Sequence, residues 1–268
     1  MKLTLATCWY SLKSKFDKNT YKKWMNNFLS NVKNFNLVIF TDEQSMEILP
    51  TELINENPRI MIIIKPLHTF CTWKKKEQWI KNHERNNLLN HHSRWNTDWQ
   101  LNMIWNEKIN FVNDVIQNEY FKSEWYGWCD IGYFRGNEVN VNQWPNINRI
   151  NALKEEKIYY GLPGNRRDLN CLLRIIMNKN DLGLPKIPIP PNQVSIAGGF
   201  FLIHHQNIEW WYTKFYDRLH QYLDNEYLVK DDQIVIVDCI LNNLKRFEII
   251  EEKNPNKDKW FVFQSFLL

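Results

Sequence analysis

Asp130 is the first residue whose type and position suggest chemistry. It lies near the end of an apolar, aromatic stretch, residues 125–131, which predicts a strand. Ligands of open α/β sheets gather beyond the carboxyl ends of the strands. A carboxylate there can hold a divalent cation that bridges two phosphates, because hard cations prefer oxygen ligands. Asp130 is therefore a candidate metal ligand, and Gly132 beside it permits close approach of a ligand. The simpler alternative is a strand-end aspartate that only forms a turn.

Two paired glycines lie in a second apolar stretch. Gly198 and Gly199 interrupt residues 194–203, which otherwise have the composition of a strand. Glycine inside a strand costs backbone entropy and packing, so it marks either a β-bulge or a place where a ligand approaches the backbone. The sequence leaves both interpretations open.

Two carboxylates and an amide, from Asp231, Asp232 and Gln233, precede a predicted helix. Either aspartate suits the N-cap, because its side chain would satisfy free backbone donors and its charge suits the helix dipole. The same groups suit catalysis, since a carboxylate can stabilise a cationic carbon or take a proton from a hydroxyl. Asp232 is the first candidate for that role and Asp231 the second, with Gln233 orienting the substrate.

Basic residues are spread along the chain, and the formal net charge is only +4. Nucleic-acid binders usually gather their basic residues on one face, whereas the densest run here is residues 74–76. We therefore expect no nucleic-acid partner. A mild positive charge suits an anionic ligand such as a nucleoside diphosphate. Lys108 and Arg166 are candidate phosphate-binding cations, Arg166 from a loop; solvated surface charges are the alternative.

The opening of the chain predicts an α/β sheet. Residues 3–7, 37–40 and 60–64 are continuous apolar runs, as strands are when both faces of a sheet are covered. A stripe of apolar side chains at helical spacing lies between the first two runs and consists of Tyr21, Trp24, Phe28 and Val32. Such alternation is typical of a mostly parallel sheet flanked by helices.

The rest of the chain continues this pattern. Thr97 and Gln100 form a candidate capping box, and one helix is expected from there to residue 118. Residues 182–192 are rich in proline, which inside a domain is typical of an active-site loop. No repeat or linker divides the chain, so residues 1–268 are expected to form one domain. Further strands are expected at residues 158–162, 247–250 and 260–263, and helices at residues 208–222 and 232–244.

Composition adds expectations about location and ligand. The five cysteines show no C-x-x-C spacing, which favours reduced thiols over a disulfide framework or a zinc site. We therefore expect a cytoplasmic protein, in the host cytoplasm or a virion if the gene is that of a large virus. No signal peptide and no membrane span are expected. Aromatic residues make up 15% of the chain and suit either core packing or stacking on sugars. Trp144, Trp210 and Trp211 are candidates for stacking on the acceptor.

These motifs together resemble the GT-A glycosyltransferases, in particular the retaining family that includes glycogenin and bacterial lipopolysaccharide galactosyltransferases. The resemblance implies a Rossmann-like domain with a central mixed, mostly parallel sheet, and a UDP-sugar donor. The opening Leu-Thr-Leu-Ala-Thr and the tyrosine after it are similar to the family's first strand, which implies that Thr7 and Tyr10 contact the uracil and ribose. Asp130 falls where the family's Asp-x-Asp motif holds Mn²⁺ (or Mg²⁺) and the diphosphate.

Other segments extend the resemblance. The Ala-Gly-Gly-Phe-Phe-Leu stretch is similar to the family's Asn-Ala-Gly-Val segment, which implies that Gly198 and Gly199 line the donor sugar. Asp232 and Gln233 match its Asp-Gln element beside the anomeric carbon. The phrases at residues 105–108, 130–135 and 198–201 resemble most closely the bacterial HtrL/YibB family of glycosyltransferase-like proteins.

Two departures from the family pattern concern the metal. Gly132 stands where the second aspartate of Asp-x-Asp would be. This puts metal dependence in question, though not donor binding. No histidine follows His220, so the family's C-terminal histidine ligand has no direct counterpart. His204 and His205 are the available substitutes.

The sequence thus predicts a hexosyltransferase that moves a sugar from a nucleotide-sugar donor to a hydroxyl of a saccharide, protein or lipid-linked acceptor, with a metal assisting. The sugar, the acceptor and the stereochemical outcome stay open. The alternative is a degenerate GT-A domain that binds nucleotide or sugar without turnover. A basic, aromatic-rich nucleic-acid protein is a third interpretation, which gives Asp130 and the paired glycines no role.

Overall fold

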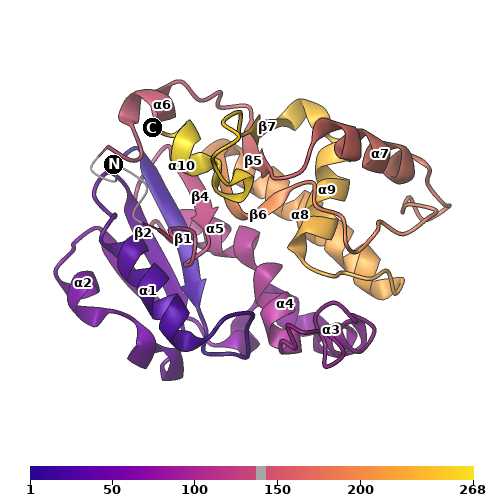
Figure 1. The fold of residues 1–268 in the computed structure, drawn as a ribbon, viewed down its shortest axis with the longest axis horizontal. Helices are drawn as coiled ribbons and strands as arrows, with labels where there is room; N and C mark the ends of the chain where they lie inside the picture. The colour runs from indigo at the N-terminus through magenta and orange to yellow at the C-terminus, as the bar shows by residue number, and fades with distance from the viewer. Residues whose placement is uncertain (137–142) are drawn as a thin grey trace.

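A computed structural model describes residues 1–136 and 143–268 (Figure 1). The strands of this part form one mixed sheet in the order β3–β2–β1–β4–β6–β5–β7. Neighbours pair in parallel except at β6, which is antiparallel to both β4 and β5. The mixed, mostly parallel sheet is confirmed. The strands are β1 (Leu3–Trp9), β2 (Asn36–Thr41), β3 (Ile60–Ile64), β4 (Trp125–Cys129), β5 (Ile158–Leu162), β6 (Ala197–His204) and β7 (Phe247–Glu251).

Helices flank the sheet on both faces (Figure 1). The α-helices are α1 (Lys18–Leu29), α2 (Thr51–Asn55), α3 (Lys76–Glu84), α4 (Trp99–Trp105), α5 (Lys108–Gln117), α6 (Ile147–Asn151), α7 (Arg166–Met177), α8 (Ile208–Asp224), α9 (Asp232–Asn242) and α10 (Phe263–Phe266). Short 3-10 helices are η1 (Gln44–Ile48), η2 (Leu67–Thr69), η3 (Cys71–Lys75), η4 (His205–Asn207), η5 (Leu244–Arg246) and η6 (Lys259–Phe261). No helix of the described residues is both long and apolar enough to cross a membrane.

Alternate residues of the central strands enter two different cores. In β2, Leu37 and Ile39 join a cluster with Phe28 of α1, whereas Val38 and Phe40 join a cluster on the other face. The continuous apolar runs of β1 and β2 therefore do reflect two covered faces.

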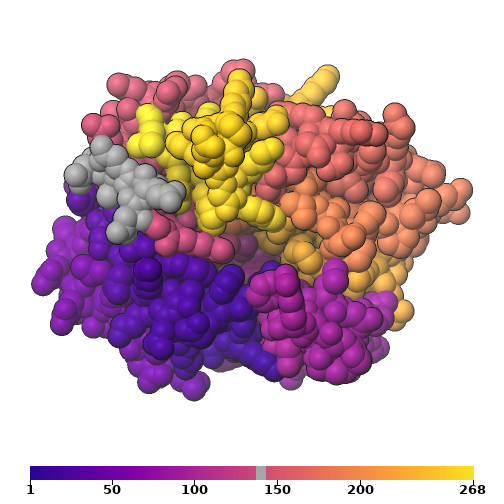
Figure 2. Space-filling model, in the orientation of Figure 1, coloured from indigo at the N-terminus to yellow at the C-terminus, as the bar shows by residue number. Residues whose placement is uncertain are grey.

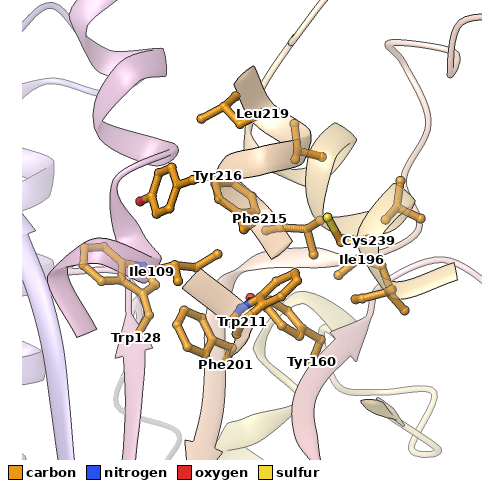
Figure 3. Close-up of a cluster of buried hydrophobic side chains, with 14 of the residues drawn as sticks. Ile109, Trp128, Tyr160, Ile196, Phe201, Trp211, Phe215, Tyr216, Leu219 and Cys239 are labelled. Carbon is orange, nitrogen blue, oxygen red and sulfur yellow. The ribbon is translucent and has the colours of Figure 1, made fainter. Parts of the chain in front are cut away.

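Figure 3 shows the second core, in which bulky side chains of β4, β5 and β6 pack under α8. Trp128, Tyr160 and Phe201 contribute from the strands, and Trp211 and Phe215 from α8. Burying a large apolar side chain of this kind contributes roughly 1.5–3 kcal/mol. This core fixes the end of β4, after which Asp130 follows.

Three expected elements are wrong in detail. β3 is an edge strand with only partial burial, so its apolar run does not mark two covered faces. Residues 260–263 are helical rather than extended, because the Asp258 carboxylate caps the turn by accepting from the Trp260 backbone N–H. The capping box does not form, since the Thr97 hydroxyl donates to the Leu89 carbonyl instead.

The helix expected up to residue 118 is divided into α4 and α5. At the division, the Tyr216 hydroxyl donates to the Asn106 carbonyl over 3.0 Å, and the Asn106 amide donates to the Asn102 carbonyl over 2.9 Å. The Tyr216 hydroxyl also accepts from the Asn110 backbone N–H over 3.2 Å, so it stands in for the backbone bond that would join Asn110 to Asn106 in a continuous helix. The division turns Lys108, the first residue of α5, towards the carboxyl edge of the sheet.

Candidate functional site

A cavity of about 500 Å³ opens at the carboxyl ends of β1 and β4, where the antiparallel β6 begins. It lies between the N-terminal and C-terminal parts of the chain, which meet on the face drawn in Figure 2 as indigo and yellow surfaces. Its lining comes from segments far apart in sequence, within residues 8–24, 95–108, 128–135, 193–199, 230–233 and 258–261. This is the edge at which ligands of α/β sheets gather.

Lys108 is the centre of the cavity floor. Its side chain is only 7% exposed, and its Nζ lies 3.2 Å from Asp130 Oδ1 and 3.0 Å from Asp232 Oδ2. The ammonium also donates to the Gly198 carbonyl over 2.8 Å. Burial alone would lower the pKa of Lys108, but the two carboxylates outweigh burial and hold the pKa above its usual value. The lysine is therefore a fixed cation in this site.

Asp130 directly follows β4 and faces the cavity with 42% of its side chain exposed. Its backbone N–H donates to the Gly199 carbonyl over 2.8 Å, which joins the end of β4 to the start of β6. Trp128 Nε1 donates to Asp130 Oδ1 over 2.6 Å. One carboxylate oxygen is thus held by Lys108 and the indole.

Asp232 begins α9 and is almost fully buried. Burial raises the pKa of its carboxyl to about 6; the Lys108 ammonium opposes this, while the charges of Asp231 and Asp130 add to it. Near neutral pH the carboxyl is ionised, yet it titrates close enough to neutrality to exchange a proton.

The paired glycines are places of close approach. A Cβ at Gly198 would lie 2.5 Å from Asp232 Oδ2, and one at Gly199 would lie 3.2 Å from Asp130 Oδ2. The bulge interpretation also has support, because the β5–β6 register shifts at Gly161, opposite Ala197. The glycines therefore adjoin a bulge and at the same time make room for the two carboxylates.

The residues before α9 do not act as side-chain caps. Asp231 occupies the N-cap position, but its side chain makes no capping hydrogen bond and pairs with Lys230. Its Oδ1 is buried without a hydrogen-bond partner among the described residues. Gln233 lines the cavity one residue beyond Asp232. Leaving a buried carboxylate oxygen unpaired is costly. A ligand in the cavity with a hydrogen-bond donor could therefore bind Asp231 Oδ1.

The remaining candidates divide into two groups. Tyr10 and Gly132 line the cavity with the residues above, whereas Thr7 and Arg166 do not. Thr7 is fully buried within β1. Arg166 begins helix α7 rather than lying in a loop, and its guanidinium contacts the Ile249 carbonyl and the Glu251 carboxylate. The structure thus places the Arg166 side chain against β7, outside the cavity.

The residues around Asp130 do not fit a metal site. A Cβ at Gly132 would lie 2.8 Å from Cε3 of Trp24, so an aspartate there has no room. His204 pairs with Trp125 at the opposite end of β4, which removes it and its neighbour His205 as substitute ligands. Across residues 1–136 and 143–268, no three His, Cys, Asp or Glu side chains are grouped to hold a metal ion.

Several sequence expectations about loops and aromatic residues also change. None of residues 182–192 lines the cavity; only Gln193 and Val194 beyond them do. Trp144 and Trp211 are buried, one in each core, and Trp210 of α8 packs against the core that holds Trp211. The cavity aromatics come instead from Trp9, Tyr10, Phe16, Tyr21, Trp24, Trp95, Trp105, Trp128, Tyr133, Trp260 and Phe261.

Sequence reasoning missed three cavity cations, Lys15, Arg135 and Lys230. Arg135 belongs to the Asp-Ile-Gly-Tyr-Phe-Arg phrase that begins at Asp130, so its nearness in sequence to a candidate carboxylate was an available signal. No comparable signal marks Lys15.

Comparison with solved structures identifies the fold. Xyloside xylosyltransferase 1 of mouse, in its apo form, superposes with a TM-score of 0.51 at 12% identity, covering 100% of this chain and 94% of that one. The chain has the GT-A fold. A complex of the galactosyltransferase LgtC with donor and acceptor sugar analogues gives a TM-score of 0.49 at 8% identity, covering 97% of this chain and 83% of that one. No family model and no curated protein matches the sequence, so the HtrL/YibB resemblance stays a prediction.

Proposed function

We propose that the protein is a glycosyltransferase that moves a sugar from a nucleotide-sugar donor, a UDP-sugar, to a hydroxyl acceptor. One observation carries the proposal: the Lys108 ammonium joins Asp130 and Asp232 on the floor of a cavity at the carboxyl edge of a GT-A sheet. Buried charges are costly unless they are paired. Their concentration in an open cavity, with a carboxylate of raised pKa, is typical of a catalytic site.

The reaction breaks the bond between the anomeric carbon and the diphosphate oxygen, whose electron pair leaves with the nucleoside diphosphate. The acceptor hydroxyl oxygen forms the new bond and loses its proton. A carboxylate at this place either stabilises the cationic carbon or receives the proton. We assign this role to Asp232, whose buried carboxylate lies on the cavity floor with Lys108 held against it.

The donor sugar is assigned to the space beside β6 and α9. Gly198 and Gly199 leave their side-chain positions open to Asp232 and Asp130. Sugar hydroxyls would donate to the unpartnered Asp231 Oδ1 and contact Gln233. Because hydroxyls both donate and accept, a site with carboxylate and amide groups side by side suits them.

The nucleoside is assigned to the end of β1. The Tyr10 hydroxyl donates to the Lys65 carbonyl over 2.7 Å, which fixes the ring at the cavity wall. Aromatic rings with a fixed polar end favour stacking on flat ligands. Thr7 is buried within β1, does not line the cavity and has no assigned contact. The acceptor is a saccharide, a protein or a lipid-linked glycan, bound by a molecule that we take to be one domain over residues 1–268.

A thermal-shift panel tests the proposal. UDP- and GDP-sugars are offered to the wild type and to Asp232→Asn, with Asp181→Asn as a control because Asp181 is exposed and lies outside the cavity. A ligand at a hundredfold its Kd stabilises the folded state by about 2.7 kcal/mol. We expect one donor to stabilise all three proteins, and donor hydrolysis or transfer to be lost in Asp232→Asn alone.

The panel also separates the alternatives. Binding without any turnover in the wild type would favour the degenerate sugar or nucleotide binder over the enzyme. No shift with any donor, in the presence or absence of divalent cations, would rule out the assignment of the donor site.

A further inference from the structure

Two cations at the cavity rim are held by aromatic rings rather than by carboxylates. Lys15 Nζ lies 4.8 Å from the Trp105 ring centroid and 5.9 Å from that of Trp95. The Arg135 guanidinium lies 4.4 Å from the Trp24 ring, 5.3 Å from Phe16 and 5.2 Å from Phe261. Within residues 1–136 and 143–268, neither cation forms an ion pair with a carboxylate.

The other two cations that line the cavity are already compensated. Lys108 pairs with Asp130 and Asp232, and Lys230 pairs with Asp231. Asp258, which also lines the cavity, accepts from the Trp260 backbone N–H at 3.0 Å. Ring contact attracts a cation through the ring quadrupole but leaves its charge intact. The cavity lining holds as many carboxylates as cations, and the two rim cations are the ones that no carboxylate of the described residues pairs with.

One aromatic strip connects the two cations. Phe16 packs against Trp24, with ring centroids 4.9 Å apart, and against Trp95, with centroids 6.0 Å apart. Lys15 contacts Trp95 at one end of the strip, and Arg135 contacts Trp24 at the other. Burial lowers the pKa of Lys15, so the folded protein disfavours its charge until an anion binds beside it. The arrangement suits an elongated anion with more than one charged group.

Trp24 links this arrangement to the missing metal site. Its ring leaves no room for a side chain at Gly132, where the resemblance implies a second aspartate. The same ring carries the Arg135 guanidinium, whose Nε donates to the Gly132 carbonyl over 3.3 Å. A cationic side chain is thus anchored at the place where a carboxylate would have held a cation.

We propose that Lys15 and Arg135 bind the diphosphate of the donor directly, so that a divalent cation is not required. This inference rests on the proposed function and deepens it. The guanidinium presents several N–H donors in a plane that matches phosphate oxygens, and the ammonium acts as a point charge. When the sugar–oxygen bond breaks, the negative charge that develops on the diphosphate is stabilised by these two side chains.

Calorimetric titration of UDP and UMP tests the proposal, first in EDTA and then with MnCl₂. Lys15→Gln and Arg135→Gln each remove one cation, and Lys13→Gln and Arg149→Gln are matched controls on exposed residues outside the cavity. We expect UDP to bind in EDTA more tightly than UMP. A hydrogen bond to a charged group changes affinity by about ten- to hundredfold. Each cavity variant should therefore weaken UDP binding by roughly tenfold or more.

If the Arg135→Gln protein folds poorly, its melting temperature without ligand will show it. Arg135→Lys then serves as the second variant at this position. Arg135→Lys keeps the charge and should retain part of the preference for UDP over UMP. A UDP affinity that depends on MnCl₂, or an unchanged preference in both cavity variants, would overturn the direct diphosphate contact and leave the transferase proposal standing. If neither nucleotide binds with or without MnCl₂, the proposed function itself fails.

Discussion

The cation on the floor of the cavity and the two at its rim differ in the groups that contact them. On the floor, Lys108 is buried against two carboxylates and a backbone carbonyl. At the rim, Lys15 and Arg135 lie over aromatic rings without a carboxylate partner among the described residues. The floor cluster has one more carboxylate than cations, so it offers no positive charge to an anion and mainly fixes geometry. Of the rim cations, Arg135 is exposed, whereas Lys15 is half-buried and burial lowers its pKa, so an anion bound beside Lys15 would favour its charged form.

The first prediction breaks the floor cluster. Lys108→Met leaves Asp130 and the buried Asp232 without their shared cation, and removing one partner of a buried ion pair costs about 3–5 kcal/mol. Chemical denaturation should show this loss in the free energy of unfolding. Adding Asp232→Asn to Lys108→Met should recover part of it, because the uncompensated buried charge is gone.

The matched control for Lys108→Met is Lys2→Met. Lys2 pairs with Glu124 at the surface, with 43% and 55% of the side chains exposed, and we expect a change within about 0.5 kcal/mol. Equal losses in the two variants would show that Lys108 has no special role in the fold.

The second prediction compares the two glycines above the floor. Gly198→Ala puts a Cβ 2.5 Å from the buried carboxylate of Asp232, whereas Gly199→Ala puts one 3.2 Å from the more exposed Asp130. A misplacement of about 1 Å in a catalytic group can lower the rate about a hundredfold. Initial rates of donor hydrolysis should fall by that order in Gly198→Ala and by much less in Gly199→Ala. The reverse order would argue that Asp130, not Asp232, acts on the anomeric carbon.

The third prediction concerns pH and the buried carboxyl of Asp232. Its folded-state pKa, about 6, lies above the ordinary value of 3.8, because burial disfavours the charge. The unfolded chain therefore loses this proton first, and the group's contribution makes the free energy of unfolding fall as the pH rises from about 4 to about 6. Denaturation curves across this range should show a weaker fall in Asp232→Asn.

Asp231→Asn sharpens the same test. Removing the neighbouring negative charge should lower the pKa of Asp232 and move the fall in stability to lower pH. Superimposable pH profiles for the wild type and both variants would contradict the assignment of a raised pKa to Asp232.

The smallest expected effect is the salt dependence of UDP affinity, which should distinguish the rim cations from the buried floor cluster. Screening shortens the reach of exposed charges from about 10 Å at 0.1 M salt to about 3 Å at 1 M. UDP affinity should therefore weaken several-fold over this range, and uridine affinity should hardly change. The unfolding free energy contributed by Lys108 should be less sensitive, since the cluster is buried. If UDP and uridine weakened equally, the rim cations would not be contacting phosphate.

Local sequence signals were enough to predict the carboxylate and glycine parts of the site. Asp130 after an apolar strand, the paired glycines and the aspartates before α9 all meet at one edge, because an α/β sheet brings strand ends together. The direction of β6 was not predictable from its own residues. Its antiparallel course is what brings Gly198, near the start of a strand, to the edge where β4 ends.

Other parts depended on contacts that no short segment encodes. The division between α4 and α5 is maintained by Tyr216, which lies far along the chain in α8. Lys15 lines the cavity beside Trp95 and Trp105, which come from a distant part of the chain. Helix α7 had a readable signal in its buried Leu169, Leu172 and Ile176 at helical spacing, although Arg166 at its start was expected to lie in a loop.

The contacts of the Lys108 ammonium also bear on the order in which the site forms as the chain is synthesised. The ammonium emerges first during synthesis, and its three contacts follow with β4, β6 and finally α9. Until α9 has docked, the buried lysine lacks one of its two carboxylate partners, and long-range contacts of this kind form slowly. We therefore expect the cavity floor to be completed late in folding, so that an immature chain would form the β1 end of the cavity before it gains the Asp232 carboxylate.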